Sequence, residues 1–404
     1  MPEKKPHKGD HIYLIDGSGY IFRAYYAQTG RFNPFLPDGT RVNAVFIFSN
    51  MLNKLLNDLE EGEKPSHLLV VFDAGRKTFR NEIFPEYKAH RPDPPEDLIP
   101  QFPLIREAVE AFNVPCIEMK GYEADDIIAT YAKQATDQGL KVSIVSSDKD
   151  LMQLVSDKVE LFDAMKNKHI GVKEVREKFG VRPDQVIDVQ SLTGDKADNV
   201  PGVPGIGEKA ASLLIKEYET LDHLLNLAKD PEVLRVDLIS RQEKTEEKIY
   251  KLAGHPFKIG SKKELGVVLF EELELPGGKK DKKGENYITT NEVLENLERE
   301  GFKIAKRILS FRQISRLTGN LCEILSENIE LAKLSRRLVT LKQDVPLDQG
   351  VDDFKVREID PEVLYPFLDA MEFKTLKAKA ISRLGALEGD KDPALEATRV
   401  KRNG

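Results

Sequence analysis

The chain has 404 residues and a formal net charge of −7, and 40% of its residues are hydrophobic and 32% charged. At about 100–200 residues per domain this length corresponds to two or three domains, and the composition excludes an intrinsically disordered chain. No apolar run approaches the ~18 residues of a membrane span, and the first residues carry no signal-peptide core. The two cysteines lie in unrelated contexts, which excludes a disulfide scaffold and a paired-cysteine zinc site. We therefore expect a cytoplasmic monomer with no membrane partner.

Three short apolar runs in the first half of the chain have the character of buried strands, because each is rich in β-branched or aromatic residues and stops at polar ones. They cover residues 11–15, 67–72 and 141–145. Helical patterns lie between them, for example at residues 44–59 and 125–138. This alternation predicts an α/β fold with a mostly parallel sheet flanked by helices. In such sheets the functional crevice lies at the carboxyl ends of the strands.

Nine acidic residues stand at these predicted strand ends or at helix starts: Asp16, Asp73, Glu123, Asp125, Asp126, Asp148, Asp150, Asp195 and Asp198. Each one alone fits a structural role, as a turn residue, a partner of a helix dipole or a solvated charge. Gathered in one crevice, however, like charges are costly unless cations neutralise them. Oxygen ligands without histidine or cysteine favour Mg²⁺ or Mn²⁺. Two such ions, about 3.5–4 Å apart, are a common device for hydrolysing phosphodiesters.

Basic residues with an interleaved aromatic follow the second predicted strand, in a proline-containing segment: Arg80, Tyr87, Lys88 and Arg91. The acidic overall balance would argue against a nucleic-acid partner, but the chain without the nine acids is slightly basic. Cations for phosphates and a ring for a base suit single-stranded nucleic acid. From the residues alone, a mobile solvated loop is an equally good interpretation.

Beyond about Asn199 the pattern becomes helical and stays so up to about Arg383. This half begins with a tight glycine turn at residues 202–207, which leads into a helical stretch at residues 208–217. Glycines let a backbone approach a phosphate closely, and the following helix start offers free amides and a positive dipole end. At the other end, residues 386–404 have the character of a flexible tail.

Five stretches carry a resemblance to a known family: LIDGSGYIFRAYYA (14–27), VVFDAGRKTFRNEIFPEYKAHRP (70–92), GYEADDIIAT (121–130), SSDKDLMQLV (146–155) and TGDKADNVPGVPGIGEKAA (193–211). Residues 11 to about 230 closely resemble the 5′-nuclease family (5′→3′ exonuclease, flap endonuclease-like), as found at the start of bacterial DNA polymerase I. The resemblance implies a PIN-like catalytic domain over residues 1–199 with two metal sites and a helical arch at about 78–112. The metal-site acids of the family fall on all nine carboxylates.

The resemblance also implies substrate contacts. Lys88 and Arg80 would hold the scissile phosphate, Tyr87 would stack on the end of the substrate, and Arg91 would bind DNA with them. Arg23 and Tyr25 match positions close to that site. The glycine turn resembles a duplex-binding helix-hairpin-helix, often completed by K⁺, with a helical domain over residues 200–232 and 320–385. Its implied DNA-binding residues are Gly202, Val203, Gly205, Ile206, Gly207 and Lys209.

Residues 233–319, called here the inserted block, interrupt this resemblance. The stretches at 246–284 and 293–319 resemble instead the polymerase module of DNA polymerase I near its thumb, where a lysine-rich loop follows a helix of the LFEEL type. We expect a helical block without DNA synthesis, because no polymerase catalytic motif accompanies it. It either grips duplex DNA through Lys279, Lys280, Lys282 and Lys283, or it is a surface module with a solvated charge run.

Three functions are compatible with these observations. The first is a metal-dependent, structure-specific 5′-nuclease that removes primers and flaps in DNA replication and repair. The second is a catalytically silent binder of DNA junctions, and the third is a PIN-type ribonuclease. The complete acid set favours the first, since a mere binder gains nothing from carboxylates that repel phosphate. The hairpin, a device for duplex DNA, weighs against the third but leaves RNA primers open as substrates.

Overall fold

The computed structural model describes residues 10–27, 34–61, 64–317 and 320–390, and it is built on a six-stranded sheet with the order β3-β2-β1-β4-β5-β6. All neighbouring strands run parallel except β5 and β6. The strands are β1 (His11–Asp16), β2 (His67–Thr78), β3 (Cys116–Gly121), β4 (Lys141–Val145), β5 (Val159–Asp163) and β6 (Lys168–Ile170). The predicted α/β fold is therefore confirmed.

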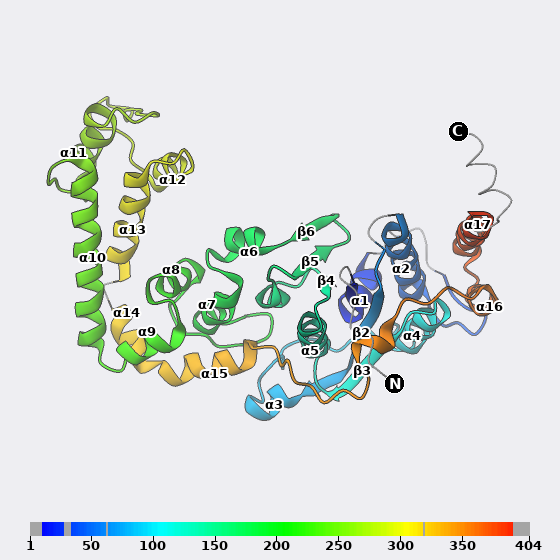
Figure 1. Cartoon of the computed structure of the whole chain (residues 1–404). Coiled ribbons are helices and arrows are strands. Elements are labelled where there is room, and N and C mark those ends of the chain that lie inside the picture. Colours follow the sequence, from blue (N-terminus) through cyan, green and yellow to red (C-terminus); the bar gives the residue numbers. More distant parts are fainter. Residues whose placement is uncertain (1–9, 28–33, 62–63, 318–319, 391–404) are drawn as a thin grey trace, which may run out of the picture.

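Helices cover both faces of the sheet (Figure 1). Alternate residues of β1 enter different cores, as the pleat requires, with Ile12 and Leu14 in one and Tyr13 and Ile15 in the other. The core around Tyr13 is completed by α1 (Gly17–Tyr26), α2 (Asn43–Glu61) and α4 (Gln101–Ala111). The core around Ile12 is completed by α5 (Ala124–Asp137), α6 (Val172–Phe179), α7 (Val186–Thr193), α8 (Glu208–Tyr218) and α9 (Leu221–Leu227).

Two predicted strand ends agree with the structure and one does not. The first and third predicted runs coincide with β1 and β4. β2, however, continues to Thr78, so Asp73 lies inside the strand, at the start of an irregularity in its pairing with β3. Strands β3, β5 and β6 were not predicted, because their sequences mix apolar with charged residues and show no clear apolar run.

The predicted arch is shorter in the structure. Helix α3 (Phe79–Ile83) is followed by turns up to residue 100. Helix α4 does not stand free over the site, since Ile105 and Val109 are buried in the core with α2. Of the predicted arch, residues 79–100 are therefore the part that is available to cover the edge of the sheet.

The helical domain is also shorter than predicted, because the chain turns back after α14 (Leu321–Glu327) and α15 (Ile329–Val339). Val345, Val351 and Phe354 pack in the core with α5, where Phe354 meets Tyr131 edge to face. Helices α16 (Pro361–Ala370) and α17 (Lys374–Asp390) then join the core of α2 and α4. Residues beyond about 340 thus belong to the catalytic domain, and the predicted tail is helical up to residue 390, its remainder lying outside the described residues.

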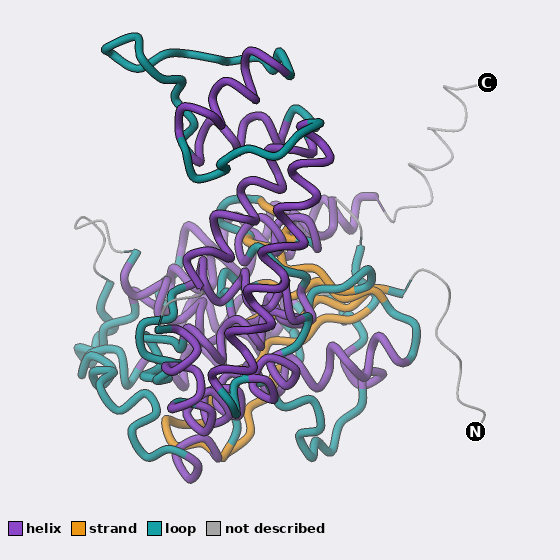
Figure 2. The backbone as a smooth tube through the Cα atoms, turned by 90° about the vertical axis from the view of Figure 1, so that its left-hand side faces the viewer, coloured by secondary structure: helices purple, strands orange, loops and turns teal. Residues whose placement is uncertain are grey.

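The inserted block projects from the molecule on a stem of two antiparallel helices, α10 (Pro231–Ala253) and α13 (Lys303–Leu317), as Figures 1 and 2 show. At its tip, α11 (Lys262–Val267), a π-helical turn (Val268–Glu272) and α12 (Asn291–Arg299) form a separate core with the upper stem. The base of the stem differs: Leu234, Leu238, Ile314 and Leu317 are buried in the main core. Among the described residues, no helix is both long and apolar enough to cross a bilayer.

Candidate functional site: an acidic cleft between two cationic walls

The carboxyl edge of the sheet gathers the predicted acids. Asp16 ends β1 and caps α1, where its carboxylate accepts a hydrogen bond from the Gly19 amide at 2.7 Å. Asp73 accepts one from the Ala124 amide at 2.8 Å, which ties β2 to the start of α5. Glu123 is the N-cap of α5, Asp125 stands in its first turn, and Asp148 follows β4. Since the charges of these groups act on Asp16 and Asp125, five carboxylates lie close together at this edge.

Mutual repulsion is visible in the pKa values of these groups. Burial, together with the charges of Asp73 and Asp148, raises the pKa of Asp16 to about 6. Burial and the charges of Asp148 and Asp16 raise the pKa of Asp125 well above its usual value. Burial and Asp148 likewise raise the pKa of Asp150 to about 6. The cleft therefore holds more negative charge than its own residues neutralise.

Three of the predicted acids, Glu123, Asp195 and Asp198, are paired with lysines and an arginine of the chain itself. Lys149 Nζ lies 2.6 Å from Asp195 Oδ2, and Lys88 Nζ lies 2.8 Å from Glu123 Oε1 and 3.4 Å from Asp198 Oδ2. Arg91 also pairs with Asp198. Burial alone would raise the pKa of Asp195, but the hydrogen bond and the charge of Lys149 lower it. These basic side chains thus form ion pairs with carboxylates that were predicted to bind metal.

Asp126 and Arg80 do not lie in the cleft, which corrects two predicted roles. Asp126 is fully buried and receives two hydrogen bonds from the Arg80 guanidinium, at 2.7 and 2.8 Å. Arg80, 1% exposed, also donates to the carbonyls of Leu338 and Thr340. The pair joins β2 and α5 to the end of α15, so in this arrangement neither residue can hold a metal ion or a phosphate.

The two tyrosines that were predicted to lie at the substrate are also engaged by other residues of the protein. The ring of Tyr87 is buried, and its hydroxyl donates to Glu123 and Asp198 at 3.2 Å each, so stacking on a substrate is closed to it here. Tyr25 donates to Asp97 at 2.8 Å and so anchors the segment of turns rather than the cleft. Arg23 does reach the cleft, where it donates to Ser147 at 2.5 Å.

The glycine turn is only partly available to a ligand. Gly202 (φ 63°) is buried against Gly194, where a Cβ would meet the Gly194 nitrogen at 2.3 Å, and its own amide donates to Ser335. The side chains of Val203 and Ile206 are buried in the main core. The remaining three predicted contacts are exposed: Gly205, Gly207 and Lys209. The hairpin therefore stays a candidate DNA contact through these three.

Two serines orient the acids and were missed by sequence reasoning. Ser146 donates to Asp16 at 2.9 Å and accepts the Asp148 amide at 3.1 Å, while Ser18 accepts the Asp73 amide at 2.8 Å. Both serines are neighbours of predicted ligands in the sequence. Orienting hydrogen bonds are regular companions of metal-binding carboxylates, and this spacing could have indicated them.

The donor set fits hard divalent cations, although the acids are not pre-arranged around one. Within the described residues, no three histidine, cysteine or acidic side chains already stand in metal-ligating geometry. The chemistry nevertheless favours Mg²⁺ or Mn²⁺, because the cleft offers carboxylate oxygens, the ligands of hard cations, and burial together with neighbouring carboxylates raises the pKa values of Asp16 and Asp125. Binding would require Lys88 and Lys149 to release their carboxylates.

We predict that Asp16→Asn stabilises the metal-free protein increasingly as the pH rises from about 4 to about 7. A carboxylate whose pKa is raised on folding disfavours the folded state above its unfolded pKa of 3.8, and this cost is complete above about 6. The expected difference at pH 7 is on the order of 2 kcal/mol. Urea unfolding of both proteins in EDTA measures it, and a difference that is constant with pH would contradict the raised pKa.

The sheet and its acidic edge define an α/β protein with a cluster of carboxylates at the carboxyl ends of its strands. A model of the 5′-3′ exonuclease N-terminal resolvase-like domain matches residues 11–180, and one of the 5′-3′ exonuclease C-terminal SAM fold matches residues 181–254. A 5′-3′ exonuclease of Aquifex aeolicus is 39% identical over 218 residues, which are 53% of this chain and 72% of that protein. The chain belongs to the 5′-3′ exonuclease family.

A third model, DNA polymerase family A, matches residues 230–343 and thus includes the inserted block. DNA polymerase I of Rhizobium leguminosarum is 41% identical over 372 residues, 91% of this chain but only 28% of that protein. The chain therefore spans roughly a quarter of the DNA polymerases I that it matches. Among solved structures, the T5 D15 protein co-crystallised with metal ions covers 82% of this chain and 100% of its own, with 19% identity and a TM-score of 0.44. That overall similarity is low, and membership of the family follows from the sequence matches.

Proposed function

We propose that the chain is a metal-dependent 5′-nuclease that hydrolyses DNA phosphodiesters at 5′ flaps and nicks, as in the removal of flaps and primers during replication and repair. The observation that carries this proposal is the group of carboxylates that raise one another's pKa at the carboxyl edge of the sheet. The names of the relatives support it, since two 5′-3′ exonucleases are each matched over 72% of their length.

Two divalent ions, Mg²⁺ or Mn²⁺, would be held by carboxylates in two groups. The inner group is Asp16, Asp73, Glu123, Asp125 and Asp148, and the outer group is Asp150, Asp195 and Asp198. Bound there, the ions would supply an activated water and neutralise the leaving oxygen. The chain itself contributes Lys88 and Arg91, which would turn from the carboxylates to the phosphate and stabilise its developing charge. The products would carry a 5′-phosphate and a 3′-hydroxyl.

Contacts to the rest of the DNA are proposed at the exposed part of the hairpin. Gly205 and Gly207 leave the backbone accessible next to the start of α8, where the positive end of the helix dipole and Lys209 attract a phosphate. K⁺ could complete this contact. Such binding reads the shape of a duplex and not its sequence.

The test is incubation of a 5′-flap duplex, labelled at its 5′ end, with and without Mg²⁺. A short 5′ product that appears only with the metal supports the proposal, and the same duplex without a flap or nick serves as the control for structure specificity. Binding without cleavage would identify a silent junction binder. Cleavage of RNA with no cleavage of DNA would identify a ribonuclease.

For the inserted block, we propose a supporting contact to duplex DNA through the lysine-rich turn at its tip. Lys279, Lys280, Lys282 and Lys283 are all exposed. The turn is held by a β-bridge between Lys280 and Tyr287 and by a hydrogen bond from the Asp281 amide to the Asn286 carbonyl at 2.8 Å. A folded turn therefore presents these lysines together at the end of the stem.

We predict that removing residues 243–311, which are the tip and the upper stem of the inserted block, leaves nuclease activity intact. Joining Gln242 to Arg312 through a short glycine linker retains Leu234, Leu238, Ile314 and Leu317, which belong to the main core, and removes the separate core of the tip. The stem helices are antiparallel neighbours, so a short linker can close the gap. If the tip grips DNA, the dependence of binding on salt should flatten, because fewer counterions are released.

Two results would contradict this prediction. An inactive or unfolded deletion protein would show that the tip is needed by the nuclease domain. An unchanged salt dependence would show that its lysines do not touch the duplex. Replacing Lys279, Lys280, Lys282 and Lys283 by glutamine in the intact chain separates loss of charge from loss of the fold.

A further inference from the structure

Two hollows each include acids of the cleft, and they have different cationic walls. One, of about 890 Å³, lies on the side of the segment of turns, where Lys88 and Arg91 line it with Asp73 and Glu123. The other, of about 430 Å³, is called here the lysine pocket and is lined by Asp16, Gly19, Tyr20, Arg23, Ser146, Ser147, Asp148, Lys149 and Lys178. The first hollow has a proposed role at the scissile phosphate. The cations of the second have no role in that chemistry.

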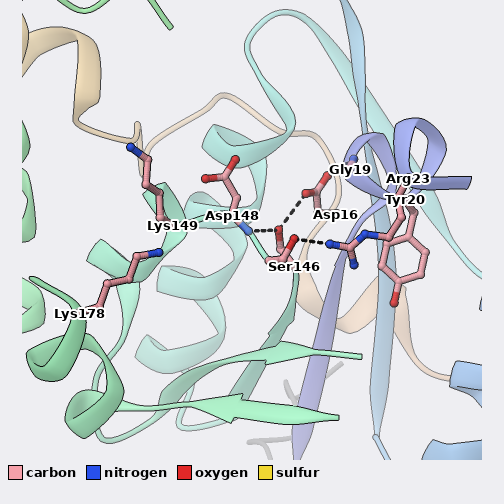
Figure 3. Close-up of a pocket in the computed structure, with 9 residues that line it drawn as sticks. Asp16, Gly19, Tyr20, Arg23, Ser146, Asp148, Lys149 and Lys178 are labelled. Carbon is pink, nitrogen blue, oxygen red and sulfur yellow. Dashed lines mark hydrogen bonds between the residues drawn. The ribbon is translucent and has the colours of Figure 1, made fainter. Parts of the chain in front are cut away.

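The lysine pocket brings together positive charges from three separate elements. Arg23 projects from α1, Lys149 precedes the short 3₁₀-helix at Asp150–Leu154, and Lys178 lies in the last turn of α6. In Figure 3, Lys149 and Lys178 approach Asp148 from the same side, while Arg23 lies on the opposite side, beyond Ser146. The acids of the cleft are thus bordered by cations here as well.

Lys178 has the surroundings of a side chain that awaits an anion. Its ammonium contacts the Phe179 ring, and in the described part of the chain it forms no ion pair. Burial and the neighbouring charge of Lys149 lower its pKa, so bringing the two ammonium groups together costs free energy in this protein. The carboxylates that face Lys178 are Asp148, Asp150 and Glu208. The first two would be neutralised by cations in the active site.

The lysine pocket lies on the side of the cleft that leads to the hairpin. The carbonyl of Phe179 accepts a hydrogen bond from Ser212 of α8 at 2.7 Å, and the next residue, Gly180, is close to Lys216 of α8. Helix α8 is the helix that follows the glycine turn. A DNA strand that runs from the segment of turns across the acids to the hairpin would pass beside the lysine pocket, because α6 packs against α8.

We propose that Lys178 and Lys149 bind a backbone phosphate of the strand being cut, on the duplex side of the scissile bond. This rests on the proposed function. When a divalent ion occupies Asp195, Lys149 loses its carboxylate partner, and its half-exposed ammonium can turn to the phosphate beside Lys178. Arg23, held by Ser147, closes the far wall of the pocket. The two lysines position the strand and take no part in bond cleavage.

The test measures binding by fluorescence anisotropy with a 5′-flap duplex in Ca²⁺ in place of Mg²⁺, so that a divalent ion can occupy the acids and free Lys149. A gel of each sample checks that the duplex remains uncut. Lys178→Ala should weaken binding about tenfold and reduce the slope of log affinity against log salt by about 0.9. Lys178→Arg should keep most of the affinity. Lys173→Ala is the matched control, because Lys173 lies on the same helix with an 82% exposed side chain and, among the described residues, its ion pair is a loose one with Glu177 across 3.9 Å. Its affinity should equal that of the wild type.

A scan with methylphosphonates locates the phosphate. One phosphate at a time near the branch is replaced by an uncharged methylphosphonate. At one position this replacement should weaken DNA binding by the wild type but leave the affinity of Lys178→Ala unchanged, because that variant already lacks the contact. That position should lie in the duplex next to the flap. Losses that add at every position, or equal binding by Lys178→Ala and Lys173→Ala, would overturn the proposal.

Cleavage assays separate this inference from the proposed function. If the wild type does not cleave in Mg²⁺, the proposed function fails whatever the binding data show. If it cleaves, Lys178→Ala should raise KM about tenfold, in line with the loss of affinity, with kcat little changed. A variant whose DNA affinity is intact but whose Mg²⁺ dependence is altered would show that Lys178 is only a counterion for Asp148 and Asp150, and this too would overturn the proposal.

Discussion

Asp125→Asn is expected to lower metal-dependent cleavage by about 10³-fold or more while the protein stays folded and binds DNA at least as tightly. Asp125 is surrounded by the charges of Asp148 and Asp16, so its loss removes a ligand from the centre of the cleft and a repulsive charge from the path of the DNA. Single-turnover cleavage across a Mg²⁺ titration and anisotropy in EDTA measure the two effects. Normal cleavage by this variant would show that the cluster is not the metal site.

Asp126, the next residue after Asp125 in the sequence, provides the matched control. Asp126→Asn should keep the metal-binding acids but destabilise the fold by about 3–5 kcal/mol, because it breaks the buried ion pair and leaves Arg80 with Glu123, 3.5 Å away, as its remaining carboxylate partner. Urea unfolding measures the loss. If Asp126→Asn is as stable as the wild type and inactive, Asp126 is a ligand after all and the pair with Arg80 is not the working arrangement.

Lys88→Ala should lower kcat by about 10²–10³-fold with little effect on DNA affinity. The left-handed backbone of Lys88 (φ 55°) and the hydrogen bond from its amide to the Asp198 carbonyl at 2.9 Å direct its ammonium onto Glu123 and Asp198. A charge that is fixed beside the reacting phosphate acts mainly on the transition state. Comparing single-turnover rates with dissociation constants separates the two effects.

The same substitution carries a second readout. Without the Lys88 ammonium, Glu123 and Asp198 lose a competitor, so divalent ions should bind Lys88→Ala at least as tightly as the wild type. Lys133→Ala is a suitable control, since Lys133 is exposed on α5 and pairs with Asp137 at 2.6 Å. A variant altered in KM alone would mean that Lys88 only attracts DNA.

The sequence predicted the parallel sheet because β1 and β4 are continuous apolar runs between polar residues. It could not predict β3, because the residues of Cys116–Gly121 alternate irregularly and each is half-buried or exposed. Nor could it predict that residues 341–390 return to the catalytic domain, because pairing between segments so far apart leaves no local periodicity. The contact between Phe354 and Tyr131 is visible only in three dimensions.

Within the site, residue types and spacing were sufficient to locate the cleft but not to orient its side chains. Asp125 and Asp126 are adjacent on α5, so the helix turns them to different directions, and only Asp125 faces the other acids. Arg80 and Lys88 were both predicted to bind phosphate. Because β2 continues to Thr78, however, Arg80 lies against the C-terminal end of α15, where it is buried and donates to the Leu338 carbonyl. Lys149 and Lys178 were not singled out, because a single lysine at a loop or helix end carries no distinct pattern.

The return of the chain after α15 has a consequence for the order in which the protein can fold as it is synthesised. In the sequence, the inserted block interrupts the helical domain, and the helical domain interrupts the catalytic domain. The innermost unit, with its separate core, is complete once residue 317 has emerged. The layer under β1 closes last, when Leu364, Leu368, Phe373 and Leu376 reach α2 and α4. Since contacts of long sequence separation form slowly, the apolar surface of α2 and α4 that α16 and α17 cover is expected to stay exposed longest during synthesis.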